Sequence, residues 1–329
     1  MTNIWTILQK PIFALAPMED VTDSVFRRVI IHCGRPSVMF TEFTNCEGLQ
    51  SVGQAKVIHR LYYTPIERPL IAQIWGITPE NYYNSAKLVV KLGFDGLDLN
   101  FGCPVKNVIK LGACSALINN RPLAKEIIQA TLEGLNGQIP LSIKTRIGFN
   151  QIQTEDWIGF LLSTAKPACL TVHGRTVKEQ SKYPVHWDEI AKCVSLRDQL
   201  SPETLILGNG DIKTYSEALE KIATFKLDGV MIGRAVFSNP WFFNPEMDPT
   251  KKTKIERLNL LKFHLELFAE TWGRQKDYHI LKRFFKIYLQ GFEQAASLRQ
   301  LFMETKNYTE ARQLVEQTLK EWNLGTDSQ

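Results

Sequence analysis

Eight short apolar segments recur along residues 12–232, and each of them ends in a polar turn. Stretches with the helical spacing of apolar residues follow most of these segments. Strands that alternate with helices pair in parallel, so the order predicts an α/β fold in which helices cover a parallel sheet. Eight such units close a (β/α)8 barrel. We place the strands at residues 12–16, 38–43, 70–75, 95–100, 141–145, 169–173, 204–207 and 229–232.

Capping and turn residues support helices between these strands. Thr22, Asp23 and Ser24 form a cap ahead of an apolar stripe, while Pro79 opens another helix and Gly93 closes it. The helices predicted in this way cover residues 24–30, 82–92, 123–135, 156–165, 188–200 and 215–225.

A second region follows residues 240–249, where three prolines in ten residues exclude a helix and indicate a linker. We therefore expect a barrel domain over residues 1–245 and a small helical domain over residues 250–329. The helices expected in this second domain cover residues 254–268, 277–292 and 308–322.

Composition narrows the class of protein. The chain is 44% hydrophobic, enough for a large core, and it lacks a long uncharged apolar run, so we expect no membrane span. Its start lacks a basic segment followed by an apolar one, so we expect no export signal. The six cysteines are scattered without zinc spacing, which favours reduced thiols, a cytoplasmic location and no metal. The net charge of +5 tolerates a nucleic-acid partner without requiring one.

Unusual polar residues fall at the ends of the predicted strands. Gln73 lies within the third strand, Asn100 ends the fourth, Lys144 lies in the fifth and His173 ends the sixth. A single buried amide or histidine is usually structural, whereas a buried lysine needs a strongly accepting partner. Because the carboxyl ends of barrel strands meet at one rim, so many polar residues indicate a functional site there.

The last two turns have the character of a phosphate site. Asn209, Gly210 and Asp211 follow the seventh strand, and Gly233 and Arg234 follow the eighth. Barrels often bind phosphate at this place with backbone N–H groups, and an arginine adds charge and a fork of donors. Two ordinary glycine turns are the plainer alternative.

A thiol lies at the mouth of the fourth strand. Gly102 permits backbone conformations that other residues avoid, and Pro104 prevents the strand from continuing beyond Cys103. The segment alone leaves two interpretations open, a small buried apolar residue or a reactive group at the rim.

Together these residues resemble the tRNA-dihydrouridine synthase family, in its order and spacing, over about residues 12–245. The helical tail resembles the family's RNA-binding domain in its position and its basic run at residues 282–286. The bacterial C-type branch of the family is favoured by Pro17-Met18-Glu19, Thr41-Glu42-Phe43 and His173-Gly174-Arg175-Thr176 followed by Glu179-Gln180. The motifs that carry the resemblance are Ala16-Pro17-Met18-Glu19, Thr41-Glu42, Gln73, Asn100-Phe101-Gly102-Cys103-Pro104, Lys144-Thr145-Arg146, His173-Gly174-Arg175-Thr176, Asn209-Gly210-Asp211 and Met231-Ile232-Gly233-Arg234.

The resemblance implies a TIM-barrel enzyme that uses FMN and NADPH to reduce the C5–C6 double bond of uridine in tRNA. Gln73 would hydrogen-bond to the pyrimidine edge of FMN, and Lys144 would lie near N1 and O2, where negative charge gathers in the reduced ring. His173 would support the same edge or the phosphate side. Further FMN contacts would come from Pro17, Met18 and Glu19 at the isoalloxazine ring, and from Asn209, Gly210, Asp211, Gly233 and Arg234 at the phosphate.

The resemblance also implies roles toward the RNA. Cys103 would donate a proton to C5 of the uracil while hydride passes from flavin N5 to C6, so its pKa should not be strongly depressed. Asn100 would help to hold the uracil, which must leave the base stack of the RNA to reach the site. We expect a monomer whose partner is tRNA, bound neither to metal nor to membrane. The residues expected at the RNA are Lys282, Arg283 and Lys286 at its phosphates, and Arg175 with residues 178–183 nearby.

Two departures from the family pattern concern the loop of Cys103. Cys114 stands where the family usually has a smaller residue, and Phe101 replaces more typical residues. Neither removes a catalytic group, but both could alter the loop.

Two other functions fit part of the pattern. A dihydroorotate-dehydrogenase-like flavoenzyme acting on a free pyrimidine shares the Asn-x-x-Cys-Pro mouth and the lysine, but its cysteine acts as a base. The basic tail and the Asn-Gly-Asp turn disfavour it. A non-catalytic RNA-binding protein on a relic barrel would have degraded mouth residues, and here they are intact.

Overall fold

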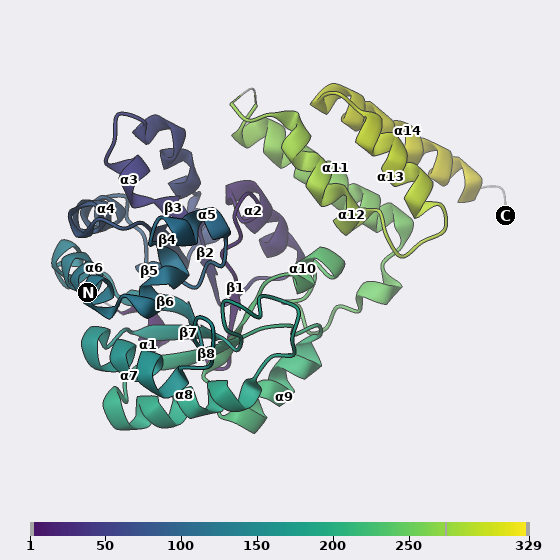
Figure 1. Cartoon of the computed structure of the whole chain (residues 1–329). Helices are drawn as coiled ribbons and strands as arrows, with labels where there is room; N and C mark the ends of the chain where they lie inside the picture. The colour runs from purple at the N-terminus through teal and green to yellow at the C-terminus, as the bar shows by residue number, and fades with distance from the viewer. Residues whose placement is uncertain (1–2, 274, 327–329) are drawn as a thin grey trace. The chain divides into compact units, whose positions relative to one another are not determined.

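The computed structural model describes residues 3–273 and 275–326. The chain divides into two compact units, which we describe separately (Figure 1). The first comprises Met1–Ser24 and Pro36–Gly233, and the second comprises Val25–Arg35 and Arg234–Gln329. The segments at 25–35 and 234–245, which the sequence assigned to the barrel domain, therefore group with the second unit.

A closed parallel barrel forms the first unit. The sheet is continuous from β1 through β9 to β4, and it closes because β2 pairs in parallel with both β1 and β4. A short ninth strand, β3 (Thr44–Asn45), extends from β4. The prediction of a (β/α)8 barrel is confirmed. Its strands are β1 (Ile12–Leu15), β2 (Val38–Phe40), β4 (Leu70–Trp75), β5 (Gly96–Phe101), β6 (Leu141–Arg146), β7 (Cys169–His173), β8 (Leu205–Asn209) and β9 (Gly229–Ile232).

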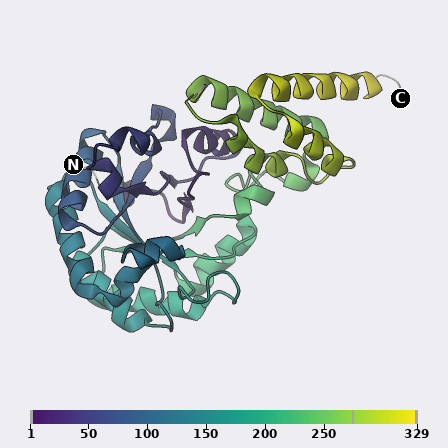
Figure 2. The same cartoon turned by 45° about the horizontal axis from the view of Figure 1, so that its top comes forward.

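Helices surround these strands, as the turned view in Figure 2 shows for the first unit. The predicted signals operate as expected at α4, where Pro79 is in the first turn and Gly93, with a φ of +78°, follows the end. The helices are α1 (Ile4–Ile7), α3 (Cys46–Leu49), α4 (Pro79–Lys91), α5 (Lys106–Lys110), α6 (Arg121–Leu135), α7 (Thr154–Ala165), α8 (Trp187–Leu200) and α9 (Tyr215–Phe225), with 3-10 turns η1 (Gln54–Lys56), η2 (Ile58–Leu61), η3 (Pro65–Glu67) and η4 (Cys114–Asn119).

The barrel interior changes from apolar to polar along the strands. Ile71 and Leu207 belong to one buried cluster with Trp5 of α1. Because side chains alternate along a strand, Gln73 lies on the same face as Ile71, and Asn209 on the same face as Leu207. The amino-terminal half of the interior is therefore a packed core, and its carboxyl-terminal rim carries the polar groups.

The second unit is helical. Phe26 of α2 stacks on Phe284 with ring centroids 5.2 Å apart, and Nδ1 of His264 lies 2.6 Å from the Tyr288 hydroxyl. These contacts join the early segment to the C-terminal helices within one core. Its elements are α2 (Ser24–Cys33), α10 (Ala235–Ser238), η5 (Pro249–Lys251), α11 (Lys254–Thr271), η6 (Tyr278–Phe284), α12 (Phe285–Tyr288), α13 (Ala295–Glu304) and α14 (Tyr308–Thr326).

Residues 240–249 contain no α-helix, as their prolines predicted, and the segment packs through the buried side chains of Trp241, Phe242 and Phe243. One expectation for this unit is wrong. Residues 277–292 are not one helix, because a 3-10 segment over Tyr278–Phe284 precedes the short α12. Its buried side chains at 278, 281 and 284 are three residues apart, which matches the three residues per turn of a 3-10 helix.

Membrane-spanning character is absent from the helices of residues 3–273 and 275–326, since none of them combines sufficient length with sufficient apolarity.

Two buried tryptophans provide a test of the barrel core. Trp157 Nε1 donates to Thr145 Oγ1 at 2.8 Å, whereas Trp5 Nε1 has no hydrogen-bond partner among the described residues. We expect Trp157→Phe to lower the free energy of unfolding by about 1 kcal/mol more than Trp5→Phe, because only the former breaks a buried hydrogen bond. Urea unfolding followed by circular dichroism measures both, and an equal or larger loss for Trp5→Phe would contradict this packing.

Candidate active site

The register of the barrel brings five predicted site residues to one rim. Asn100 on β5 pairs with Lys144 on β6, and His173 on β7 pairs with Asn209 on β8. Gln73 on β4 completes the group, since its amide bonds to that of Asn100. Closure of the sheet thus gathers side chains that lie far apart in the sequence.

Hydrogen bonds connect the polar side chains of β4, β5 and β6. Ser142 Oγ donates to Asp98 Oδ1 at 2.6 Å, and Gln73 Nε2 donates to Asp98 Oδ2 at 2.7 Å. Asn100 Nδ2 donates to Gln73 Oε1 at 3.0 Å. Burial raises the pKa of Asp98 to about 6, against the effect of these donors and of the Lys144 charge. The carboxylate is therefore the main form at neutral pH.

The loop of Cys103 is fixed from both sides. Asn100 Oδ1 accepts from the backbone N–H groups of Gly102 and Cys103, each at 3.1 Å. Arg146 Nε donates to the carbonyl of Gly102 at 2.8 Å, and Ser115 Oγ donates to that of Cys103 at 2.6 Å. The Cys103 residue is 8% exposed, so its thiol lies at the surface of the mouth with little access to water.

Cys114 is the main influence on the Cys103 thiol. A hydrogen bond from Cys114 lowers the pKa of Cys103 to about 7, with help from the Val105 N–H and the Arg146 charge and against the effect of burial. The expectation that the pKa of this thiol is not strongly depressed is therefore wrong. Burial raises the pKa of Cys114 itself well above its usual range. Cys114 has a φ of +53°. The sequence departure at this position therefore reaches the thiol that the family motif identifies.

Lys144 is a cation held in a poorly solvated place. Its Nζ donates to Asn209 Oδ1 at 3.1 Å, and Asn209 Nδ2 donates to the carbonyl of Met231 at 2.8 Å. Desolvation and the neighbouring Arg146 lower the pKa of Lys144 to about 8. The ammonium form still predominates at pH 7, and a negative group beside it would favour that form further.

Arg175 binds the loops that follow β7 and β8 together. Its Nε donates to the carbonyl of Tyr183 at 2.6 Å, and its Nη2 bonds to Asp211 Oδ2. It is 1% exposed, so its burial argues against the expected contact with RNA. Gly210 has a φ of +135°, and a Cβ there would lie 2.7 Å from Val185, so this turn requires glycine.

The loop after β1 supplies the residues expected at the flavin ring. Pro17 is buried, Met18 is half-buried and Glu19 is exposed. Glu19 Oε1 accepts from Arg60 Nη2 at 2.7 Å, so this carboxylate is already paired. A Cβ on Gly233 would lie 3.9 Å from Met18 Sδ, which shows that the ends of β1 and β9 adjoin. Arg234 begins the second unit, and its phosphate contact stays a prediction.

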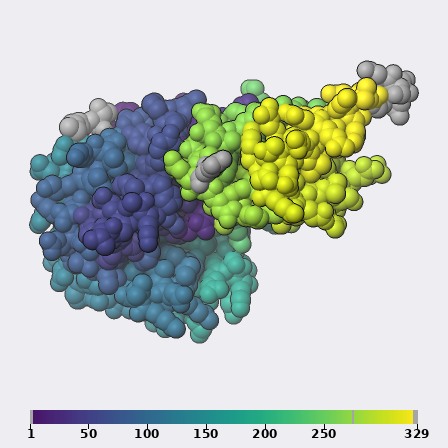
Figure 3. All heavy atoms as spheres, turned by 90° about the horizontal axis from the view of Figure 1, so that it is seen from above, coloured from purple at the N-terminus to yellow at the C-terminus, as the bar shows by residue number. Residues whose placement is uncertain are grey.

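The three basic residues predicted to bind RNA lie in η6 and α12 of the second unit. Arg283 and Lys286 are exposed, while Lys282 Nζ donates to the carbonyl of Met303 at 2.6 Å. Figure 3 shows the surface of this unit, with the residues beyond about 300 in yellow. Their contact with RNA stays a prediction.

Three charged residues near the rim were missed as site residues. Asp98 lies two residues before Asn100, and Arg146 lies two residues after Lys144, so the alternation along a strand places them on the same inward face. The two-residue alternation along each strand was therefore enough to predict Asp98 and Arg146 as site residues. Arg60 comes from a 3-10 turn without a strand-like pattern, and no sequence signal connected it with Glu19.

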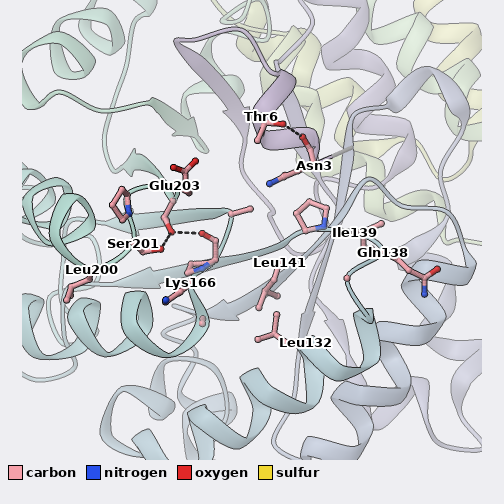
Figure 4. A pocket seen from close by; sticks show the side chains of 17 residues that line it. Asn3, Thr6, Leu132, Gln138, Ile139, Leu141, Lys166, Leu200, Ser201 and Glu203 are labelled. Atoms are coloured by element: carbon pink, nitrogen blue, oxygen red, sulfur yellow. Dashed lines mark hydrogen bonds between the residues drawn. The ribbon is translucent and has the colours of Figure 1, made fainter. Parts of the chain in front are cut away.

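A large cavity of about 670 Å³ lies at the opposite end of the barrel (Figure 4). It is lined by residues that precede β6, β7 and β8, including Gln138, Lys166 and Glu203. The polar side chains described above lie toward the carboxyl ends of the strands or in the turns after them, so the cavity is separate from them. Size alone therefore does not identify the site.

The basic side chains around the rim suit an anionic ligand, or a ring that takes up negative charge. Lys144, Arg146, Arg175 and His173 all come from β6, β7 or the turn after β7. Across residues 3–273 and 275–326, no group of three histidine, cysteine or acidic side chains could hold a metal ion. Nitrogen donors and a desolvated cation match a phosphate and the electron-accepting edge of a heterocycle.

Comparisons with known proteins agree with the motifs. The family model described as "Dihydrouridine synthase (Dus)" matches residues 14–323. A Staphylococcus aureus protein named "Probable tRNA-dihydrouridine synthase" is 43% identical over 318 residues, which cover 96% of this chain and 95% of that protein. A Bacillus subtilis protein named "Probable tRNA-dihydrouridine synthase 2" is also 43% identical over 318 residues, covering 95% of this chain and 96% of that protein.

Among solved structures, a histamine dehydrogenase from Rhizobium sp. 4-9 is similar in fold. The TM-score is 0.54 at 12% sequence identity, and the match covers 80% of this chain and 51% of that chain. At this identity the likeness concerns the barrel fold alone.

The cysteines differ sharply in predicted reactivity. Because the thiolate is the reactive form, iodoacetamide should label Cys103 first, with a half-maximal rate near pH 7. Mass spectrometry of peptides measures this selectivity, and Cys103→Ala is the control. Labelling of another cysteine first, or a flat rate from pH 6 to 8, would contradict the site. The cysteines expected to resist, because burial raises their pKa, are Cys33, Cys46, Cys114, Cys169 and Cys193.

Proposed function

Because this chain belongs to the dihydrouridine synthase family, as its motifs predicted, we propose that it reduces uridine in tRNA to 5,6-dihydrouridine with FMN and NADPH. The observation that carries the proposal is that Cys103 and Lys144 lie at the same rim. Arg146 on β6 donates to the carbonyl of Gly102 in the loop of Cys103, and its charge also acts on Lys144. A proton donor and a fixed cation on one rim are what reduction of a polarised double bond needs.

The residues present fit FMN. Lys144 and the second N–H of the Gln73 amide, beside the one that donates to Asp98, suit the pyrimidine edge of the ring, and the turn at Asn209–Asp211 with its glycine suits the phosphate. When bound, FMN supplies the hydride for C6 of the uracil and is itself reduced by NADPH. The Lys144 ammonium group would stabilise negative charge on the edge of the ring. Because Lys144 is desolvated, this electrostatic attraction would be stronger than in water.

Cys103 supplies the proton for C5 of the uracil. As hydride reaches C6, the S–H bond breaks, its proton forms the new C5–H bond, and the sulfur keeps the electron pair as a thiolate. Arg146, the Val105 N–H and the Cys114 thiol favour that thiolate, and water then returns the proton. Asn100 orients the loop through its amide oxygen, and one N–H of its amide donates to Gln73, so we assign it a positioning role in uracil binding.

The second unit supports RNA binding in this proposal. Arg283 and Lys286 are exposed and suit phosphate groups, whereas the Lys282 ammonium already has a carbonyl partner. The barrel would act as the catalytic domain and residues 250–329 as the tRNA-binding domain of a cytoplasmic monomer. Family membership favours tRNA over a free pyrimidine as the substrate.

Replacement of the proposed proton donor tests the reaction. We expect Cys103→Ala to bind FMN normally, seen as an unchanged yellow spectrum, and to form dihydrouridine about 10²- to 10⁴-fold more slowly. Mass spectrometry of nucleosides from treated tRNA measures the product. Cys193→Ala, another buried cysteine, is the matched control and should keep full activity. Undiminished turnover by Cys103→Ala would contradict the role of Cys103 as the acid. A wild-type protein that does not bind FMN would contradict the proposed cofactor.

The pH dependence follows from the same groups. Cys103 must be protonated to act as an acid, so kcat/KM should fall as pH rises through about 7. Lys144, whose pKa desolvation lowers to about 8 in the protein without ligand, loses its charge only at a higher pH than Cys103 loses its proton, which should steepen the decline at the alkaline end. Initial rates from pH 6 to 9 measure this profile, and a rate that rises steadily to pH 9 would contradict it.

Charge removal tests the RNA surface. We expect the triple replacement of Lys282, Arg283 and Lys286 by glutamine to weaken tRNA binding and to lower the slope of log K against log salt by about 2 to 3. The matched control replaces three exposed lysines of α4 and α6 and should leave the slope unchanged. Equal effects of the two triples would show that only net charge matters. The control positions are Lys87, Lys91 and Lys125.

A further inference from the structure

Asp98 is a fully buried carboxylate inside the barrel, to which neither the motifs nor the proposed reaction gives a role. Donors from both neighbouring strands hold it, Gln73 Nε2 on β4 and Ser142 Oγ on β6. Its strand, β5, leads directly into the loop of Cys103. A buried charge between two strands costs stability unless it is fully bonded, so its presence calls for a reason.

A chain of two amides leads from this carboxylate to the thiol loop. The Gln73 amide bonds to Asp98 through its nitrogen and to Asn100 through its oxygen, at 2.7 Å and 3.0 Å. The Asn100 oxygen then accepts from the backbone N–H groups of Gly102 and Cys103, each at 3.1 Å. The order of contacts is thus carboxylate, amide, amide and loop backbone.

The ends of this chain determine the direction of both amides. A carboxylate only accepts hydrogen bonds, and a backbone N–H only donates them. Between such ends, every bond is made only if each amide points its nitrogen toward Asp98. Reversal of either amide would bring two donors or two acceptors together in a buried place, where unmade bonds are costly.

We propose that Asp98 is a positioning residue for the thiol of Cys103, acting through Gln73 and Asn100 to fix the loop that carries it. The inference rests on the proposed function in one respect, the catalytic role of the Cys103 thiol. The charged and titratable groups facing Asp98 are Lys144 on β6 and Cys169 on β7. Since Lys144 favours the ionised carboxyl, the acceptor is present at neutral pH.

Two substitutions at Asp98 separate its role as an acceptor from its bulk. Asp98→Leu keeps the size and removes the acceptor, so Gln73 loses its anchor. Asp98→Asn keeps an acceptor oxygen for Gln73, while its NH2 group can donate to Ser142, whose hydroxyl accepts as well as donates. Thr131→Val, which removes a buried hydroxyl bonded to Ile127 in α6, is the control for general destabilisation.

The test follows Cys103 in the full-length protein without tRNA. We expect Asp98→Leu to raise the pH of half-maximal iodoacetamide labelling from about 7 toward the usual thiol value near 8.5. Hydrogen exchange of the peptide containing residues 100–104 should quicken about tenfold, as for the loss of one hydrogen bond. Asp98→Asn should restore both values, and Thr131→Val should leave both unchanged.

Three results would overturn the proposal: wild-type values in folded Asp98→Leu, equal effects of the asparagine and the leucine, or an equal effect of Thr131→Val. If Asp98→Leu does not fold, Asp98→Ala is measured against the same criteria. Neither readout needs turnover, so a failure here is distinct from a failure of uridine reduction.

Discussion

Closure of the barrel is the constraint on which the site depends. Parallel pairing of β2 with β1 and β4 joins the ends of the sheet, so all carboxyl ends of the strands meet at one rim. Residues separated by many turns of chain thereby become neighbours, as in the bond between Lys144 and Asn209. The opposite half of the interior is filled by an apolar cluster that includes Trp5, so the polar side chains of the rim lie on a packed core.

Buried charge is tolerated at this rim because each charge has partners. Asp98 accepts from Ser142 and Gln73, and Lys144 donates to Asn209. The environment nevertheless moves the pKa values of Asp98 and Lys144 toward neutrality, to about 6 and about 8. Together with Cys103 at about 7, the site holds three groups that respond to pH within a narrow range. Such clustering is typical of catalytic sites.

The fold and much of the site could be predicted because they depend on local patterns. Strand–helix alternation is a periodic signal, and it predicted the barrel; the alternation along β5 and β6 would also have revealed Asp98 and Arg146. What could not be predicted depends on tertiary contacts. The pairing of Arg60 with Glu19 and the burial of Arg175 result from loops meeting in space. Residues 277–292 have helical spacing, yet a buried row three residues apart makes their first half a 3-10 segment.

The central claim is that this chain reduces uridine in tRNA and that Cys103 takes part in the reduction. The most direct measurement maps dihydrouridine, position by position, in tRNA from cells that lack the protein and from the same cells supplied with wild-type or Cys103→Ala protein. We expect particular dihydrouridines to disappear without the protein, to return with the wild type and to stay absent with Cys103→Ala. An unchanged map in cells that lack the protein, or full restoration by Cys103→Ala, would contradict it.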